Sequence, residues 1–400
     1  MDIKKLFNIL TVFGFCLIIF AAPVLTKLEP HTDYSIFENR TLTAPPVFSF
    51  ESLFKCEYLP AWDKYYSDHM CMRTGILKVK NIIDVNLMHR PVVNDVVIQK
   101  DYLLPFQKYD QDASYVREYA QKMGARLASL NDLVNSYGGK FIYIGVPEQY
   151  SMFRDFYPAY LNNNDELLSS IESSFFTELD SYGIDYINMR TEFYKTKDYT
   201  EYYSKADHHY NLFGAFLTYQ TLINHINKNN GGSAFDSALP VLTENDIEFI
   251  KLDNPFYGSR NRKLYNSYSL DDRLYYYVQK NPLEFTRINN GVNVAPQVFK
   301  TPSDNYSPVT YDLYMSGDIA ETIIITARPY LHNALLFGDS FTNPFETFLY
   351  QSFNETRSLD MRHYKECTIL EYIERYKPDF VFCMRDDTAY LSFDGNGNIK

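Results

Sequence analysis

The sequence predicts an α/β protein in which helices cover both faces of a parallel sheet. Helical and strand patterns alternate between about residues 112 and 226, and again between 334 and 383. The strand patterns are short continuous apolar runs such as 141–146, which are typical of strands buried on both faces. Strand–helix repetition at this spacing places functional sites at the carboxyl ends of the strands.

The elements of the first alternating stretch have clear boundaries. Apolar residues at helical spacing predict helices over 116–134, 168–179 and 212–226, and apolar runs predict strands over 141–146 and 184–188. Glycines follow the first two helices, where a left-handed residue commonly ends a helix.

A long segment without this alternation separates the two stretches. Residues 231–329 are rich in Tyr, Asn, Ser and Asp and contain short β-like runs at 274–278 and 322–325, so we expect a β-rich insertion. The α/β domain would then comprise residues 110–230 and 330–400. Its second stretch is predicted to contain strands over 334–337, 359–362 and 380–383, and helices from 344 and over 368–376.

The N-terminus predicts a membrane anchor. Lys4 and Lys5 precede a mostly apolar run over 6–25, and Lys27 follows it. This run is long enough to span hydrocarbon, and its positive flank favours a cytoplasmic N-terminus. A signal peptide cut after Ala21–Ala22 is the alternative. We expect a retained signal anchor over 1–27, a stalk and N-terminal segment over 28–109, and a single-pass protein with its α/β domain outside the cytoplasm.

Composition narrows the class of protein. The 400 residues are 46% apolar and 17% aromatic, which is enough to bury a large core, and the 36 tyrosines suit carbohydrate surfaces as well as ordinary packing. A net charge of −12 argues against a nucleic-acid partner. The four cysteines outside the anchor could pair locally, Cys56 with Cys71 and Cys367 with Cys383, or remain free thiols, and their spacing matches no zinc site.

The strongest candidate for a nucleophile is Ser340, in Gly338-Asp339-Ser340. This sequence directly follows the predicted strand 334–337 and precedes a predicted helix. A serine at a strand-to-helix turn stands above the sheet, with backbone N–H groups facing the atom that its oxygen attacks. The alternative is that Asp339 or Ser340 only caps the following helix.

A serine nucleophile needs a base that a third group orients. Asp207 and His209 lie two residues apart just before the predicted helix 212–226, so the carboxylate can reach Nδ1 and leave Nε2 free. Three alternatives compete. Asp207, His208 and His209 could bind a metal ion, the Asp-His-His sequence could belong to a metal-dependent phosphoesterase, or the histidines could simply sit at a helix cap.

Taken together, these motifs resemble the DHHW family of bacterial surface proteins, an SGNH-hydrolase-like group related to the alginate O-acetyltransferases. The resemblance rests on Asp207-His208-His209-Tyr210 with Gly214-Ala215, and on Gly338-Asp339-Ser340-Phe341 much later in the chain. Further stretches that fit are Glu38-Asn39-Arg40, Asp68 with Arg73, Asn94-Asp95-Val96-Val97-Ile98, Phe256-Tyr257-Gly258-Ser259, Leu359-Asp360-Met361-Arg362 and Lys377-Pro378-Asp379.

The resemblance implies a three-layer α/β/α domain with a Ser-His-Asp triad. Carried over by position, Ser340 is the nucleophile, His209 the base and Asp207 its orienting group, whereas His208 is not expected to act. Tyr210 replaces the family's tryptophan and would keep an aromatic wall.

The sequence pattern does not single out the oxyanion donors. Asp318 stands where an asparagine-like residue is expected, and a carboxylate there suits an oxyanion poorly. The N–H of Ser340, the N–H of Gly317 and the side chain of Arg362 are therefore the candidate donors.

The expected function is serine-dependent O-acyl transfer, with acetyl as the expected acyl group, to a cell-surface polysaccharide. No metal and no cofactor are expected, and by resemblance a multi-spanning membrane-bound acyltransferase would supply the acyl group. A carbohydrate O-acetyl esterase of the same fold, with water as the acceptor, is the first alternative. A non-catalytic glycan-binding or assembly protein with a degenerate site is the second.

Overall fold

The described chain consists of two structural units. The computed structural model describes residues 3–29, 32–107, 113–161, 164–229, 238–268 and 270–400. Unit 1 is formed by Met1–Val96 with Asn261–Ser269, and unit 2 by Val97–Arg260 with Leu270–Lys400. The start of the predicted insertion, 231–237, lies outside the described residues.

Unit 2 contains most of the regular structure. Its helices are α5 (Val116–Ser136), α6 (Gln149–Met152), α7 (Asp165–Ser181), α8 (Met189–Tyr194), α9 (Leu212–Asn229), α11 (Thr342–Leu349) and α12 (Ile369–Tyr376). Its strands are β5 (Leu103–Pro105), β6 (Lys140–Val146), β7 (Asp185–Asn188), β8 (Ile247–Lys251), β9 (Tyr275–Gln279), β10 (Thr286–Asn289), β11 (Val292–Val294), β12 (Glu321–Ile325), β13 (Asn333–Gly338), β14 (Glu355–Leu359) and β15 (Phe380–Asp386).

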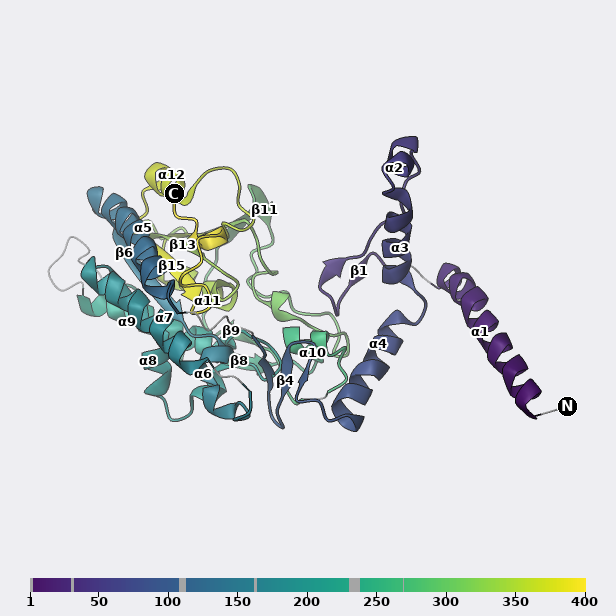
Figure 1. Ribbon diagram of the computed structural model, residues 1–400. Helices are drawn as coiled ribbons and strands as arrows, with labels where there is room; N and C mark the ends of the chain where they lie inside the picture. Colours follow the sequence, from purple (N-terminus) through teal and green to yellow (C-terminus); the bar gives the residue numbers. More distant parts are fainter. Residues whose placement is uncertain (1–2, 30–31, 108–112, 162–163, 230–237, 269) are drawn as a thin grey trace. The chain divides into compact units, whose positions relative to one another are not determined.

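An eight-stranded mixed sheet forms the centre of unit 2 (Figure 1), in the order β11-β10-β12-β14-β13-β15-β6-β7. The strands from β14 to β7 are parallel, as the sequence predicts. The strands β12, β10 and β11 extend the sheet in antiparallel pairing. Because β13 and β15 are parallel, with Gly338 opposite Met384, their carboxyl ends meet at one edge.

Helices pack on the two faces of this sheet through alternating strand residues. On one face, Phe337 of β13 and Val381 of β15 belong to the same buried apolar cluster as residues of α5, α7 and α12. On the other face, the sulfur of Met384 lies 4.0 Å from the Tyr210 hydroxyl, just before α9. The sheet is therefore covered on both sides, and the predicted α/β class is confirmed.

Most predicted α/β elements lie within a few residues of their expected bounds. The first predicted helix corresponds to α5, which ends before Gly138, a residue with a φ of +87° that favours glycine. The strand predicted over 359–362 is an exception, because β14 covers Glu355–Leu359. It lies between the parallel β13 and the antiparallel β12, but only Thr356 and Leu359 of its five residues are buried. The segment therefore lacks the continuous apolar run that is typical of a central strand.

Residues of the predicted β-rich region have two different locations in unit 2. The strands β10, β11 and β12 belong to the main sheet, whereas β8 and β9 form a separate antiparallel pair. The β-like runs predicted at 274–278 and 322–325 correspond to β9 and β12.

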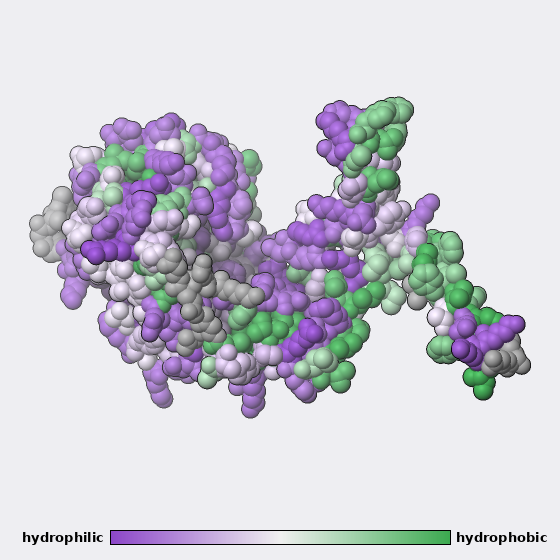
Figure 2. All heavy atoms as spheres, viewed as in Figure 1, coloured by the Kyte–Doolittle hydropathy of each residue, from purple (hydrophilic) through white to green (hydrophobic). Residues whose placement is uncertain are grey.

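Unit 1 is mainly helical. Its elements are α1 (Ile3–Leu28), β1 (Tyr34–Ser35), β2 (Arg40–Thr41), α2 (Phe50–Phe54), α3 (Tyr58–His69), α4 (Arg73–Ile82) and β3 (Val92–Val93), and its boundaries with unit 2 fall within β4 (Val96–Ile98) and α10 (Ser259–Lys263). Arg40 donates two hydrogen bonds to the carboxylate of Asp68, which links β2 to α3. Figure 2 shows apolar side chains exposed over α2 and α4, among them Phe50 and Phe54.

Within the described chain, α1 is the one helix that is long and apolar enough to cross a membrane. The five cysteines are all free, so the local pairing considered from sequence is not formed. Cys383 is buried in β15, where it packs in the apolar core.

Candidate active site

Ser340 lies in the turn between β13 and α11. Gly338 ends the strand, and a Cβ there would overlap the backbone carbonyl of Met384 in β15, so only glycine permits this approach. The Asp339 carboxylate accepts hydrogen bonds from the N–H of Phe341 (3.0 Å) and from the N–H of Asp386 (2.9 Å). These contacts tie the turn to the adjacent strand and leave Ser340 partly exposed.

The predicted base and nucleophile are in hydrogen-bond contact. Nε2 of His209 lies 2.7 Å from Oγ of Ser340, and Nδ1 lies 2.6 Å from Oδ1 of Asp207. The structure thus brings the predicted Asp207–His209 pair into contact with the predicted nucleophile, which lies far away in the sequence. With Nδ1 protonated and donating to Asp207, Nε2 is available to accept the serine proton.

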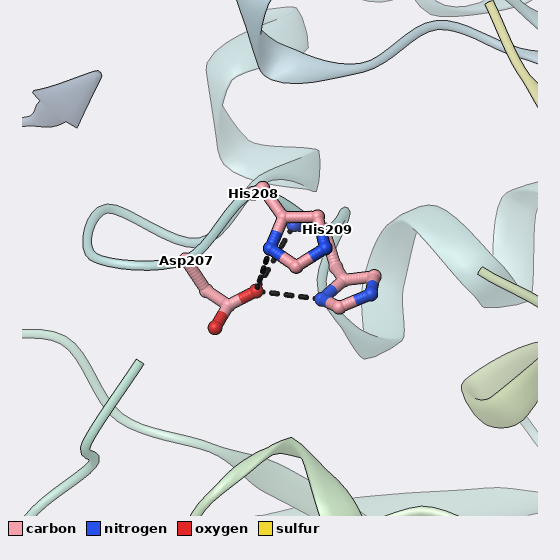
Figure 3. Close-up of side chains that lie close together, drawn as sticks. All are labelled: Asp207, His208 and His209. Atoms are coloured by element: carbon pink, nitrogen blue, oxygen red, sulfur yellow. Dashed lines mark hydrogen bonds and ion pairs between the residues drawn. The ribbon is translucent and has the colours of Figure 1, made fainter. Parts of the chain in front are cut away.

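Asp207 is buried, and several groups hold its carboxylate in place. Figure 3 shows one oxygen directed toward both His208 and His209. The other oxygen accepts a hydrogen bond from the N–H of Ser259 at 2.6 Å. Burial opposes ionisation, but the charges of His209 and His208, with the hydrogen bonds from His209 and Ser259, keep the pKa of Asp207 well below its usual range. The group is therefore a carboxylate at neutral pH.

Arg260 also holds the loop that carries Asp207 in place. Its guanidinium donates hydrogen bonds to the backbone carbonyl of Asp207 and to the side-chain oxygen of Gln149. Its own N–H donates to the carbonyl of Ala206 at 3.0 Å. Arg260 is buried, so these contacts are made away from solvent, where charge-assisted hydrogen bonds are strong. The sequence analysis did not identify Arg260, because no local pattern links it to a loop 53 residues earlier.

The two faces of the His209 ring contact other rings. The ring of Tyr311 lies nearly parallel to it, with centroids 3.8 Å apart and an interplanar angle of 7°. The ring of His208 lies 3.7 Å away, and its Nδ1 is 2.9 Å from the hydroxyl of Ser259. Tyr311 comes from the predicted β-rich region and had no sequence signal, so the aromatic wall at this site was assigned to the wrong residue.

Tyr210, the predicted aromatic wall, is instead a buried structural residue. Its side chain has no exposed surface, and its hydroxyl donates a hydrogen bond to the carbonyl of Phe341 at 2.7 Å. This contact links the loop that carries His209 to the start of α11. A tyrosine supports this contact because its hydroxyl needs a partner when it is buried.

Two of the three oxyanion candidates are bound to other groups. The N–H of Gly317 donates to the carbonyl of Tyr314 at 3.0 Å, so it is not free for a ligand. The guanidinium of Arg362 donates to Asp360 and Asp318, at 2.6 and 2.9 Å for the same nitrogen. Asp318 is thus paired with a cation. Among the described residues, the N–H of Ser340 has no hydrogen-bond partner and remains the available donor.

The same loop also carries three side chains of types that bind metal ions. Ligand atoms of Asp207, His208 and His209 lie within 4.8 Å of one another, and no ion is needed to explain their hydrogen bonds. A metal ion bound to Nδ1 or Nε2 of His209 would compete with Asp207 or Ser340 for that nitrogen. Acid–base chemistry and metal binding are therefore mutually exclusive uses of His209.

Comparison with known proteins identifies the fold that carries this site. Residues 96–244 match the family model for the SGNH hydrolase-like domain of the acetyltransferase AlgX. The chain has an SGNH-like fold. The family model and the structural neighbour thus confirm the resemblance predicted from sequence. The matched residues include Asp207 and His209 and end before Ser340.

Two solved structures share this SGNH-like fold. Bacillus cereus PatB1 with a sulfonyl adduct has a TM-score of 0.61 and 19% identity, over 74% of this chain and 95% of that one. A DHHW family protein from Eubacterium siraeum DSM 15702 has a TM-score of 0.56 and 15% identity, over 75% of this chain and 93% of that one. At these identities the likeness concerns the fold. A search of curated proteins gave no match.

Proposed function

We propose that this protein is a membrane-anchored, extracytoplasmic O-acyltransferase that acetylates a cell-surface polysaccharide through an acyl-serine intermediate. The observation that supports this most strongly is the continuous contact from Asp207 through His209 to Ser340. Residues 110–230 and 330–400 would form the catalytic domain, with strands from 231–329 completing its sheet. The helix α1 would be the anchor.

The proposed reaction has two steps that use the same base. Nε2 of His209 takes the Ser340 proton as Oγ attacks the acyl carbonyl, and the resulting imidazolium gives that proton to the departing group of the donor. Nε2 then takes a proton from a sugar hydroxyl, which attacks the acyl-serine ester. The imidazolium returns this proton to Oγ, which restores the serine. The N–H of Ser340 would stabilise the oxyanion in both steps.

The acyl donor must reach the outer side of the membrane. The site itself does not carry an acyl group across the membrane. We therefore propose that a multi-spanning membrane-bound acyltransferase supplies the acyl donor. The same machinery with water as the acceptor would be an esterase, so the partition between sugar and water decides which activity dominates.

A transfer assay tests the proposal. Full-length protein in lipid nanodiscs would be incubated with p-nitrophenyl acetate and oligosaccharides, with and without EDTA, and acetylated sugar would be followed by mass spectrometry. We expect transfer by the wild type and by Ser181→Ala, an exposed serine on α7. We expect Ser340→Ala to lose at least a thousandfold, on the scale known for triad nucleophiles.

Each other outcome has a definite meaning. Acetate release without sugar acetylation would favour the esterase. Equal transfer by wild type and Ser340→Ala would contradict the acyl-serine mechanism. If no form turns over and polysaccharide binding is unaffected by Ser340→Ala, the non-catalytic glycan-binding or assembly protein becomes the better explanation. Loss of activity on addition of EDTA would favour a metal ion at His209.

A further inference from the structure

A cavity of about 570 Å³ lies beside the loop that carries Asp207 and His209. Its volume falls within the range of about 300–1,000 Å³ that is usual for small-molecule sites. It lies entirely in unit 2. We refer to it as the tyrosine groove, and the residues that define it here are Tyr102, Tyr202, Phe213, Tyr275, Lys205 and Arg273.

The aromatic side chains of the tyrosine groove are held in place but only partly buried. Tyr202 stacks on Phe193 with centroids 5.5 Å apart, and Tyr102 meets the ring of Phe153 edge-on at 5.2 Å. Within the part of the chain that the structure describes, the hydroxyls of Tyr102, Tyr202 and Tyr275 have no hydrogen-bond partner. The groove thus presents fixed apolar surfaces together with unused hydroxyl groups, a combination that suits a ligand with both apolar faces and hydroxyls.

Charged side chains at the groove are also available. The ammonium groups of Lys205 and Lys251 have no ion-pair partner among the described residues, and Arg273 has a distant one in Asp271, at 3.9 Å. Glu201 and Asp271 line the groove as acceptors. The groove thus combines cationic hydrogen-bond donors and anionic acceptors with an aromatic surface. Such groups can hydrogen-bond the ring hydroxyls of sugars.

The groove is physically connected to the proposed catalytic residues. Asp272, which lines it, accepts hydrogen bonds from the N–H groups of Lys205 and Ala206, both at 2.8 Å. Those residues immediately precede Asp207. Asn211, which also lines the groove, caps α9 just after His209 by accepting from the N–H of Phe213. A ligand in the groove would therefore lie along the segment that presents His209 to Ser340.

From these observations we propose that the tyrosine groove binds a stretch of the acceptor polysaccharide next to the sugar that is acetylated. This inference rests on the proposed function, because it identifies the acceptor as a saccharide held beside the Asp207–His209 loop. The aromatic rings would pack on sugar faces, and the free hydroxyl, ammonium and guanidinium groups would hydrogen-bond sugar oxygens.

Binding can be measured without turnover. Full-length Ser340→Ala protein in lipid nanodiscs would be titrated calorimetrically with hexasaccharides of glucose, N-acetylglucosamine and galacturonic acid. We expect at least one of these probes to bind. Two variants on this background, Tyr202→Ala and the pair Lys251→Ala with Arg273→Ala, should each raise its Kd at least tenfold. The pair changes surface side chains only, so it tests the groove even if Tyr202→Ala folds poorly. Tyr160→Ala, an exposed tyrosine outside the groove, is the matched control and should bind normally.

Two results would overturn the proposal: no binding of any of the three probes, or groove variants that bind as tightly as Tyr160→Ala. A preference for galacturonic acid would show that the cations dominate recognition, and a preference for the neutral probes that the aromatic rings do. Acetylation of Ser340 by p-nitrophenyl acetate, measured separately on the wild type, tests the proposed function alone. If the probes bind in a groove-dependent way but Ser340 is not acetylated, the proposal of a saccharide-binding groove is supported and the proposal of a transferase is rejected.

Discussion

The turn at Ser340 and the loop at Asp207–His209 meet through the hydrogen bond between His209 and Ser340 and through that from Tyr210 to Phe341, but different interactions hold them in place. The turn depends on close backbone packing, because Gly338 lies against the carbonyl of Met384 and Asp339 is tied to the adjacent strand. The loop depends on polar contacts with side chains and backbone groups far away in sequence. Substitutions that alter backbone packing should therefore displace the nucleophile Ser340. Substitutions that remove charged or hydrogen-bonding groups should displace the base His209.

The polar support of the loop includes several buried ionisable groups. Arg260 contacts the carbonyl of Asp207 and lies 3.5 Å from the carboxyl of Glu148. The N–H of Glu148 donates to Asp387, which is paired with Arg190 at 2.8 Å. Buried ionisable pairs of this kind contribute little to stability as pairs, but removing one partner alone is costly. Changing one of them should therefore disturb the base while leaving the nucleophile turn intact.

The largest effect is expected for the orienting carboxylate. Asp207→Asn keeps the shape of the side chain but no longer accepts the Nδ1 proton as a charged partner, so His209 loses the tautomer that accepts from Ser340. We expect kcat to fall by about 10³–10⁴, the range found for other triads. Asp185→Asn removes a carboxylate from a surface pair with His225 and is the control, with unchanged kcat. A loss below tenfold for Asp207→Asn would contradict its assigned role.

The second prediction tests the turn. In Gly338→Ala, the new methyl group would overlap the Met384 backbone, and we expect a loss of about 3 kcal/mol in the free energy of unfolding. Gly75→Ala in α4 is the matched control, because no atom lies within 4 Å of the added carbon. It should leave stability unchanged or raise it by up to about 1 kcal/mol. Urea denaturation of the two variants measures both, and equal stabilities would show that the strand approach does not require glycine.

The third prediction concerns Arg260 as a positioning residue. Arg260→Met keeps much of the volume but removes the donors to the Asp207 carbonyl, so we expect kcat to fall about 10- to 100-fold through a misplaced base. Arg260→Lys retains the charge and should recover part of the rate. Arg117→Met, on the exposed side of α5, is the control. If Arg260→Met and Arg260→Lys lose stability but keep the wild-type kcat, Arg260 serves only the fold.

The smallest effect should appear in the pH dependence of stability. Burial raises the pKa of Glu148 to about 8, and that of Asp387 to about 6. In the unfolded chain these carboxyls titrate near 4. Between that pH and the pKa in the folded state, the folded protein binds more protons than the unfolded chain, so stability falls as the pH rises. Between pH 6 and 8 Glu148 should account for most of the fall, on the order of 2 kcal/mol.

Glu148→Gln provides the direct comparison. Its free energy of unfolding should be nearly constant between pH 6 and 8, where that of the wild type declines. Chemical denaturation at several pH values measures both slopes. Parallel curves for the two proteins would mean that Glu148 does not titrate in this range.

The same contrast explains what the sequence could predict. The turn at Ser340 was predictable because a continuous apolar strand, a glycine and a helix signal lie within a dozen residues. Asp207 and His209 were predictable because they are neighbours in sequence. The supports of the loop, Ser259 and Arg260, come from about 50 residues further along the chain. Ser259 lies in a stretch that fits the family resemblance, but no local pattern links either residue to Asp207.

Two further differences have similar physical causes. Tyr210 was assigned as a wall from its position beside His209, but its side chain is buried against α11, and Tyr311 stacks on the histidine instead. The antiparallel strands β10, β11 and β12 were predicted as part of an insertion, because alternating or short β patterns do not reveal which sheet a strand joins.

The most direct test of the central claim is the mass of the intact protein after incubation with p-nitrophenyl acetate. Full-length wild type, Ser340→Ala and His209→Ala would be quenched in acid and compared. A single acetyl adduct on the wild type, absent from Ser340→Ala and strongly reduced in His209→Ala, is the expected result. An adduct that persists in Ser340→Ala, or no adduct in any form, would contradict an acyl-serine intermediate at this site.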